Sequence, residues 1–362
     1  MAKFAIMGFG TVGGGVAEVL RLNGGAIAEK LGEPLSLQYI LDLRDLSETP
    51  YADKAVKDFS ILENDPELEL VVEAIGGAKA ALEFTRRALL AGKHVVTSNK
   101  ELVAAHGREL LAIAREKNVS YLFEASVGGG IPVLRPLSQC LSGNRVQEIV
   151  GILNGTTNYI LTRMVQDGVS FDEALKEAQA KGYAEQNPAA DVEGVDACRK
   201  ICILSDLAWG GEVRPEAVHT QGITAIDLRD VAIASGAGYR IKLLGRALAL
   251  PDGRLAAYVA PHLVPLSCPV AGVDDVFNAI MIRGNAVGDV MFYGRGAGDL
   301  PTASAVMGDI IDALQHRGSP RKLGWDRDAA LVDFDTELPL YWYLRGDFTP
   351  PPGSQILSAG AV

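Results

Sequence analysis

The chain has 362 residues, of which 48% are hydrophobic and 22% are charged, a composition typical of globular proteins with two or three domains. Lys and Arg number 34 against 45 Asp and Glu, and this net charge of −11 argues against nucleic acid as a partner. Four cysteines without a CxxC pair do not form a disulfide framework, so Cys198 and Cys202 are expected to be small core residues. Because neither a stretch of about 18 apolar residues nor a secretory leader is visible, we expect a cytoplasmic protein with no membrane partner.

A glycine-rich turn follows the first predicted strand, residues 3–7. The turn reads Gly8-Phe9-Gly10-Thr11-Val12-Gly13, and an amphipathic helix pattern follows it. In a dinucleotide-binding fingerprint Gly8 permits the tight turn, Gly10 lets the backbone approach a pyrophosphate, and Gly13 allows close helix packing. The free N–H groups at the start of the helix then favour phosphates. The motif therefore predicts a nucleotide site, with a purely structural turn as the alternative.

Predicted strands and helices alternate through the first third of the chain. The strands are expected at 37–41, 68–75, 94–97 and 120–123, and the helices at 80–91 and 102–117. This alternation predicts an α/β fold with a doubly wound parallel sheet, whose ligands bind beyond the carboxyl ends of the strands. Gly76, Lys100 and Glu124 all follow such ends.

The end of the second strand bears on the choice between NAD and NADP. Asp42 is an acid of the type that holds an adenosine ribose, whereas Arg44 favours a 2′-phosphate. A solvated loop is the alternative reading of this segment. The choice of cofactor stays open, with Arg44 favouring NADP.

Two segments in the middle of the chain need unusual backbone paths or carry clustered polar groups. Gly128-Gly129-Gly130 is either a domain hinge or a place where carbonyls turn inward and, with Glu124, ligate a hard cation. The segment 154–158, Asn-Gly-Thr-Thr-Asn, either contacts a small polar ligand or forms a turn with a helix cap at Thr156 or Thr157.

Residues 181–200 are the densest polar segment. Glu185 is expected on a loop, and a helix is predicted over 195–209, which places Asp196 and Lys200 one turn apart on one face. Most such pairs lie on the surface. The apolar run that follows Lys200 predicts a buried helix instead, in which charges are costly unless they face a cleft.

At these segments the chain resembles the homoserine dehydrogenase family, from residue 3 to about 320. The matching segments are GFGTVG (8–13), HVVTSNKELVA (94–104), FEASVGGGIPV (123–133), ILNGTTNYIL (152–161), KGYAEQNPAADVEGVDACRK (181–200) and YGRGAGDLPTASAVMGDI (293–310). The resemblance implies reversible, NAD(P)H-dependent reduction of L-aspartate 4-semialdehyde to L-homoserine, a step toward threonine, methionine and isoleucine.

The resemblance also implies roles for particular residues. Lys200 would be the general acid/base, and Lys100 a second, electrostatic lysine beside the nicotinamide. The substrate would be bound by Glu185, Asp196, Asp191, Asn154 and Thr156. The cofactor-contacting segments would include Phe9, Thr11, Val12, Gly76, Lys100 and Gly298. A structural sodium ion would be held by Glu124 with the carbonyls of Val127, Gly129 and Ile131.

The chemistry of the reaction agrees with two lysines in one pocket. Negative charge develops on the carbonyl oxygen as hydride arrives, and an ammonium group can stabilise and protonate that oxygen. In the oxidation direction the lysine must first be neutral. A second cation beside it, or burial, lowers its pKa and makes this possible.

The resemblance further implies an architecture. A dinucleotide-binding domain would span 1–132 and be completed by 294–320, with a helix from Thr302. An α+β domain for substrate binding and homodimer formation would span 133–293, and a partly flexible extension 321–362. Arg295 stands where the family usually has Pro, and it either touches a cofactor phosphate or, as we expect, points into water.

The ends of the chain carry three further expectations. We expect no aspartate kinase domain and no complete ACT domain, and therefore no threonine feedback. Residues 341–345 resemble the opening strand of an ACT module, and the proline-rich residues 349–354 are expected to form a flexible tail.

Three other interpretations fit the residues less well. Dehydrogenases of the Gfo/Idh/MocA type share the glycine turn and an AGKHV strand, but carry EKP where this chain has Ser98-Asn99-Lys100. Aspartate-semialdehyde dehydrogenase needs a nucleophilic cysteine, and none of the four cysteines sits in a glycine-rich elbow. A non-catalytic NAD(P)-binding sensor would be expected to lack the lysines and acids that this chain has.

Overall fold

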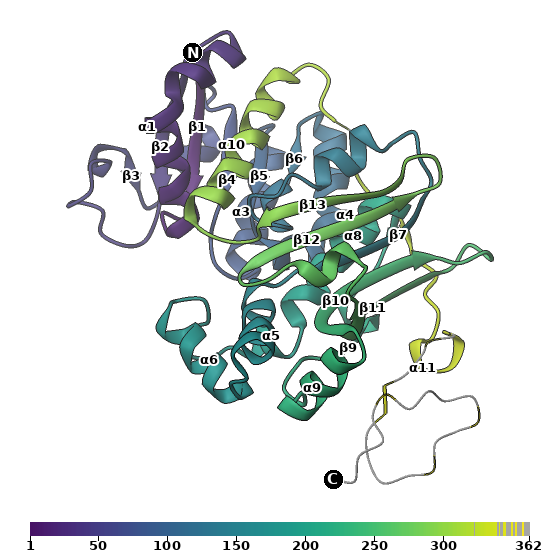
Figure 1. Ribbon diagram of the computed structural model, residues 1–362. Coiled ribbons are helices and arrows are strands. Elements are labelled where there is room, and N and C mark those ends of the chain that lie inside the picture. The colour runs from purple at the N-terminus through teal and green to yellow at the C-terminus, as the bar shows by residue number, and fades with distance from the viewer. Residues whose placement is uncertain are drawn as a thin grey trace.

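Two six-stranded sheets organise the chain, and Figure 1 shows them with helices packed around both. The computed structural model describes residues 1–321, 323–338, 340, 343–344, 349, 352 and 357. Within this part of the chain, no helix is both long and apolar enough to cross a membrane. Short 3-10 or π turns link the main elements: η1 (Ala52–Lys54), η2 (Glu124–Ser126), η3 (Pro136–Cys140), η4 (Pro215–Ala217) and η5 (Pro269–Gly272).

The first sheet is parallel throughout and has the order β3-β2-β1-β4-β5-β6. Its strands are β1 (Ala2–Met7), β2 (Leu35–Leu41), β3 (Ala55–Val56), β4 (Leu70–Glu73), β5 (His94–Thr97) and β6 (Tyr121–Leu122). Strands β1 and β4 in the middle of the sheet read as largely apolar runs because both of their faces are buried. This order is that of a doubly wound dinucleotide-binding sheet, which confirms the predicted fold class. The two-residue edge strand β3 was not predicted.

Helices cover both faces of this sheet. They are α1 (Thr11–Leu31), α2 (Ser60–Asn64), α3 (Lys79–Leu90), α4 (Lys100–Lys117) and, from late in the chain, α10 (Asp299–Gln315). Figure 1 shows α10 lying beside α1 and β4, which come from the other end of the chain. The prediction that this helix begins at Thr302 is wrong, because Pro301 fits within the first turn of a helix.

The second sheet is mixed and has the order β13-β12-β7-β10-β11-β9. Its strands are β7 (Val146–Ile152), β9 (His219–Thr220), β10 (Tyr239–Ala249), β11 (Leu255–Pro265), β12 (Phe277–Gly284) and β13 (Gly288–Arg295). The helices of this part are α5 (Gly155–Asp167), α6 (Phe171–Ala180), α7 (Ala189–Val192), α8 (Val195–Trp209) and α9 (Leu228–Gly236). Helices α5, α8 and α9 pack against its strands.

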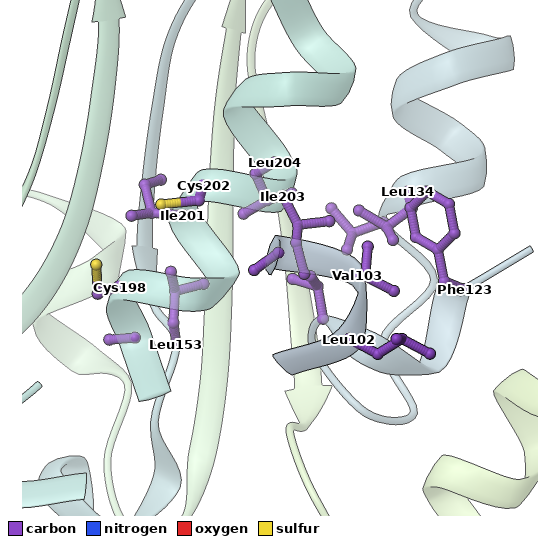
Figure 2. Packing of buried hydrophobic residues seen from close by; sticks show 14 of the residues in the cluster. Leu102, Val103, Phe123, Leu134, Leu153, Cys198, Ile201, Cys202, Ile203 and Leu204 are labelled. Atoms are coloured by element: carbon purple, nitrogen blue, oxygen red, sulfur yellow. The ribbon is translucent and has the colours of Figure 1, made fainter. Parts of the chain in front are cut away.

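Helix α8 joins the two sheets through its packing. It contacts α4 on one side and β7, β10 and β11 on the other. Figure 2 shows Ile203 and Leu204 of α8 facing Leu102 and Val103 of α4, while Cys198 lies on the side of the strands. The helix begins and ends where predicted, and it is buried as its apolar run indicated. Cys198 and Cys202 are both buried core residues, as expected.

The segment after α10 returns across both sheets. Trp325 is buried against Gly107 of α4, and β14 (Arg327–Asp328) pairs in parallel with β8 (Gly211–Glu212) at the end of α8. A last short helix, α11 (Phe334–Glu337), follows. The expected ACT-like strand at 341–345 and the flexible tail at 349–354 lie largely outside the described residues.

Candidate active site

Two lysines meet one carboxylate where the first sheet's helix α4 contacts α8. Lys100 is the first residue of α4, and its Nζ lies 2.7 Å from Oδ1 of Asp196, as an ion pair rather than an aligned hydrogen bond. Lys200 donates from its Nζ to Oδ2 of the same carboxylate, also at 2.7 Å. The predicted i,i+4 pair of Asp196 and Lys200 is therefore present and buried.

The start of α4 differs from the sequence prediction in a way that matters for Lys100. The helix was predicted from residue 102, but it begins at Lys100 because the Asn99 side chain accepts a hydrogen bond from the Leu102 N–H and caps it. Lys100 thus projects from the first turn of a capped helix rather than from a loop. Its side chain remains 40% exposed, while that of Asp196 is 5% exposed.

Burial and the neighbouring charges act against each other at Asp196 in this cluster. Burial favours neutral Asp196, but the charges of Lys200 and Lys100 outweigh it and hold the Asp196 pKa well below its usual range. Burial also lowers the pKa of Lys200, assisted by the charge of Lys100 and opposed by Asp196. The site therefore contains a lysine that loses its proton more readily than a solvated lysine does.

Asn154 holds the acids of the site together. Its Nδ2 donates to Oδ1 of Asp191 at 2.7 Å and to Oδ2 of Asp196 at 2.9 Å. Its Oδ1 accepts from the Thr157 N–H at 2.9 Å and so caps α5, so the predicted cap at Thr156 or Thr157 is wrong. The reason is that an Asn in extended conformation directly before the helix competes successfully for this role. Burial raises the pKa of Asp191, and the Asn154 amide opposes that shift.

Two other predicted substrate residues, Thr156 and Glu185, form no hydrogen bond with the Asn154 side chain. The Thr156 hydroxyl donates to the carbonyl of Tyr183 at 2.6 Å, which links the start of α5 to the loop before α7. Glu185 is on that loop, as predicted, but its side chain is exposed and forms no hydrogen bond or ion pair within the described residues. The structure therefore brings together Lys100, Asn154, Asp191, Asp196 and Lys200, and leaves Glu185 outside their hydrogen-bond network.

The glycine-rich turn has the shape that a dinucleotide fingerprint needs. Gly8 has a φ of +89°, and a Cβ there would meet the Ala74 carbonyl oxygen at 2.6 Å. A Cβ at Gly13 would lie 2.1 Å from the Gly8 carbonyl oxygen, whereas a Cβ at Gly10 would meet nothing within 4 Å. No side chain caps the start of α1, because its N-cap is Gly10, and the first turn of α1 holds no acidic residue. The turn thus fits a pyrophosphate.

Other predicted cofactor residues surround this turn. Gly298, with a φ of +120°, precedes α10, whose first turn packs against Gly15 of α1. Gly76 is exposed after β4. Arg295 is exposed, as expected for a side chain that points into water. Its guanidinium also lies 5.5 Å from the centre of the Phe277 ring, a contact that was not predicted.

Asp42 and Arg44 lie together at the end of β2. Oδ2 of Asp42 accepts from the Phe9 N–H of the glycine turn at 2.7 Å. Arg44 donates to both carboxylate oxygens, from Nε at 3.0 Å and from Nη2 at 2.6 Å, and remains 60% exposed. The Arg44 guanidinium is the main reason why the Asp42 pKa lies well below its usual range. A cation is therefore held beside the turn.

The Glu124 carboxylate is fully engaged by backbone donors. It accepts from the N–H groups of Val133, Leu134 and Arg135 at 2.6 to 2.8 Å. Val127, Gly129 and Ile131, whose carbonyl oxygens are expected to face a sodium ion, are buried residues, and within the described part of the chain these oxygens accept no hydrogen bond. Carbonyl oxygens without a donor can ligate a hard cation, whereas the Glu124 side chain already accepts from the backbone.

Sequence reasoning missed two contributors to the site. The Leu153 carbonyl accepts from Lys200 Nζ at 2.7 Å, which no side-chain motif can reveal. The bridging role of Asn154 depends on tertiary contacts with two acids. A buried acid outside this network, Glu73 at the end of β4, does leave a signal in the sequence, because it is an acid within the apolar run 70–75.

Comparison with known proteins agrees with this arrangement. The family model for homoserine dehydrogenase matches residues 132–311, and that for its NAD-binding domain matches residues 8–124. Homoserine dehydrogenase of Neisseria gonorrhoeae is 44% identical over 86% of this chain and 72% of its own length. That of Pseudomonas aeruginosa is 43% identical over the same shares.

Solved structures give the same result. A homoserine dehydrogenase from Thiobacillus denitrificans superposes with a TM-score of 0.84 at 41% identity, over 88% of this chain and 74% of that one. A hyperthermophilic archaeal homoserine dehydrogenase in complex with NADPH gives 0.71 at 29% identity, over 86% and 97%. These comparisons do not support the alternative dehydrogenases or the sensor.

Proposed function

The chain belongs to the homoserine dehydrogenase family, and we propose that Lys100, Asp196 and Lys200 form the centre at which it interconverts L-homoserine and L-aspartate 4-semialdehyde. The observation that carries this proposal is the pair of lysines held at 2.7 Å on the two oxygens of one buried carboxylate. The bound nicotinamide cofactor supplies or accepts the hydride.

Lys200 is proposed as the general acid/base. A lysine ammonium has three N–H donors, and two of those on Lys200 are taken by Leu153 and Asp196. The third is free to donate to the substrate oxygen, stabilise charge on it and pass it a proton. In the oxidation direction the same nitrogen accepts the hydroxyl proton, which its lowered pKa favours.

Lys100 is proposed to act electrostatically on Lys200, and the acids are proposed to bind the substrate. Lys100 lowers the Lys200 pKa and stands on the dinucleotide-binding side of the site. Asp196 already faces two ammonium groups, so we assign the substrate α-ammonium chiefly to Asp191, with Glu185 reaching in from its exposed loop. Asn154 and Thr156 complete the substrate side.

We propose NADP as the preferred cofactor. The pyrophosphate would lie on the turn from Gly8 to Gly13, with Phe9, Thr11 and Val12 along it, and Gly76 and Gly298 would border the cofactor. Arg44 is held beside this turn by its contact with Asp42, which itself accepts from the Phe9 N–H. A 2′-phosphate would find there a charged donor that NAD cannot use.

Further properties are proposed on the same basis. A sodium ion would be held by the carbonyls of Val127, Gly129 and Ile131, and Glu124 would order the backbone beside it. Residues 1–132 with 294–320 would act as the cofactor domain, and 133–293 as the substrate domain, in the cytoplasmic synthesis of threonine, methionine and isoleucine. A homodimer would pair through the outer face of β13, where Met291 and Tyr293 are 41% and 54% exposed.

The proposal is tested by mixing the protein with L-homoserine and either NAD or NADP at alkaline pH, and following the absorbance of reduced nicotinamide. We expect turnover, and faster turnover at low cofactor concentration with NADP. Failure of both cofactors to react, in protein that binds either of them, would refute the assigned centre.

A further inference from the structure

Glu73 is a buried acid to which neither the sequence nor the mechanism gives a role. It is the last residue of β4, is 0% exposed, and pairs across the sheet with Thr97 at the end of β5. Within the part of the chain that the structure describes, no lysine or arginine forms an ion pair with it. Burial raises its pKa to about 7, opposed by the hydrogen bonds that it accepts from Thr97 and Ile75. An acid in such a place is costly.

Its two oxygens hold the two loops that leave the sheet toward the cofactor side. Oε1 accepts from the Ile75 N–H at 2.7 Å, in the loop after β4, and Oε2 accepts from the Thr97 hydroxyl, at the end of β5. The same hydroxyl accepts from the Asn99 N–H at 2.9 Å. Glu73 therefore reaches Asn99 through one intervening side chain.

Asn99 links this chain of hydrogen bonds to α4 and to the loop after β4. Its Oδ1 accepts from Leu102 N–H at 3.0 Å as the helix cap, and its Nδ2 donates to the Gly77 carbonyl at 2.8 Å. Lys100 follows Asn99 directly and reaches Asp196. Glu73, Thr97 and Asn99 thus form a continuous chain of hydrogen bonds that ends at the residue before Lys100.

We infer that Glu73 is a positioning residue for Lys100, and that it fixes the first turn of α4 and the loop 74–77 relative to one another. The inference deepens the proposed function, since it rests on the assigned role of Lys100. Backbone pairing between β4 and β5 already holds the strands. The carboxylate adds a link between the loops beyond the strand ends, which strand pairing does not provide.

The side-chain chemistry explains why an acid is used here. Both oxygens accept, one from a backbone N–H and one from a hydroxyl that itself accepts from the Asn99 N–H. A glutamine places an acceptor oxygen at one of these two positions and an amide donor at the other, so it cannot accept from both donors there. The substitution Glu73→Gln keeps the size of the side chain and removes one of the two hydrogen bonds that Glu73 accepts.

The test compares Glu73→Gln with Asp206→Asn, which removes another buried acid, on α8, that takes no part in this chain of hydrogen bonds. We expect Glu73→Gln to lower kcat at least 10-fold with the KM for homoserine changed less than 3-fold. We expect Asp206→Asn to change kcat less than 2-fold. Retention of wild-type kcat by Glu73→Gln would overturn the inference.

A double substitution separates positioning from general support of the fold. If Glu73 acts through Lys100, adding Glu73→Gln to Lys100→Met lowers kcat by less than 2-fold, because the positioned group is already gone. Losses that multiply would overturn the inference. If Glu73→Gln does not fold, Thr97→Val replaces it in the test. We expect Thr97→Val to show the same loss of kcat and Thr97→Ser to keep wild-type kcat. Wild-type kcat in Thr97→Val would overturn the inference.

A readout independent of turnover distinguishes this inference from the proposed function. Amide hydrogen exchange of residues 97–103 should accelerate at least 10-fold in Glu73→Gln and stay unchanged in Asp206→Asn. Faster exchange in a protein that does not oxidise homoserine would keep the positioning role and reject the reaction. Unchanged exchange would reject the positioning role whatever the activity.

Discussion

Lys100 lies 2.7 Å from Asp196, so a cation at the start of α4 faces an anion in the first turn of α8. The two helices belong to different sheets and pack along their apolar sides (Figure 2). This ion pair crosses the boundary between the part of the chain that fits the cofactor and the part that fits the substrate. Each side therefore influences the protonation of Lys200, which contacts the same carboxylate.

The first prediction concerns the pH dependence of homoserine oxidation, which requires neutral Lys200. Asp196 raises the Lys200 pKa and Lys100 lowers it. Asp196→Asn should therefore move the acidic limb of the kcat profile to lower pH, and Lys100→Met should move it to higher pH. Both variants should be slower than wild type. Shifts of equal sign in the two profiles would contradict the assignment of the limb to Lys200.

The parallel, doubly wound sheet, the glycine turn and α8 were predictable because each leaves a local pattern in the sequence. Strands buried on both faces read as apolar runs, and the i,i+4 spacing of Asp196 and Lys200 follows from helical periodicity. The predictions of the first residue of α4 and of the cap of α5 were wrong, because in each case a single asparagine caps the helix. The contacts of Lys200 with Leu153, and of Asn154 with two acids, join segments more than 35 residues apart, which no local pattern encodes.

The second prediction separates two functions of Asn154. Serine is also a good helix cap, so Asn154→Ser should preserve the cap of α5. It cannot bridge Asp191 and Asp196, whose carboxylates then repel each other without the shared amide donor. We expect kcat/KM for homoserine to fall roughly 10- to 100-fold, in line with about 1.5–3 kcal/mol for a lost hydrogen bond to a charged group. Unchanged kcat/KM with an unchanged melting temperature would refute the bridging role.

The third prediction concerns cofactor choice. A charged hydrogen bond to a phosphate contributes about 1.5–3 kcal/mol, so Arg44→Ala should raise the KM for NADP roughly 10- to 100-fold and leave that for NAD within about 3-fold. Arg21→Ala is a matched control, because Arg21 is another exposed arginine paired with an acid, Glu18, on α1. If both variants weaken NADP equally, the effect is one of overall charge and Arg44 does not read the 2′-phosphate.

The fourth prediction concerns stability. Burial raises the pKa of Asp206 to about 8, from an ordinary value of 3.8. Between these values the folded state keeps a proton that the unfolded state releases, so the free energy of unfolding falls as pH rises, by at most about 1.4 kcal/mol per pH unit. Asp206→Asn removes this loss, and its carbonyl can still accept from the Val213 N–H, as Oδ1 of Asp206 does.

Urea unfolding of both proteins at pH 5, 7 and 9 checks this. The free energy of unfolding of wild type should decline relative to that of Asp206→Asn as pH rises, with most of the difference reached by about pH 8. A constant difference between the two proteins over this range would show that Asp206 does not hold a proton in the folded state.

The most direct test of the catalytic assignment is the turnover of Lys200→Met, measured with L-homoserine and NADP beside wild type and beside Lys176→Met, a lysine on α6 outside the site. We predict that Lys200→Met loses at least about 100-fold in kcat, as expected for removal of a general acid/base, while its binding of NADPH, followed by fluorescence, stays within about 3-fold. Lys176→Met should match wild type. A Lys200→Met protein that oxidises homoserine at the wild-type rate would contradict the account.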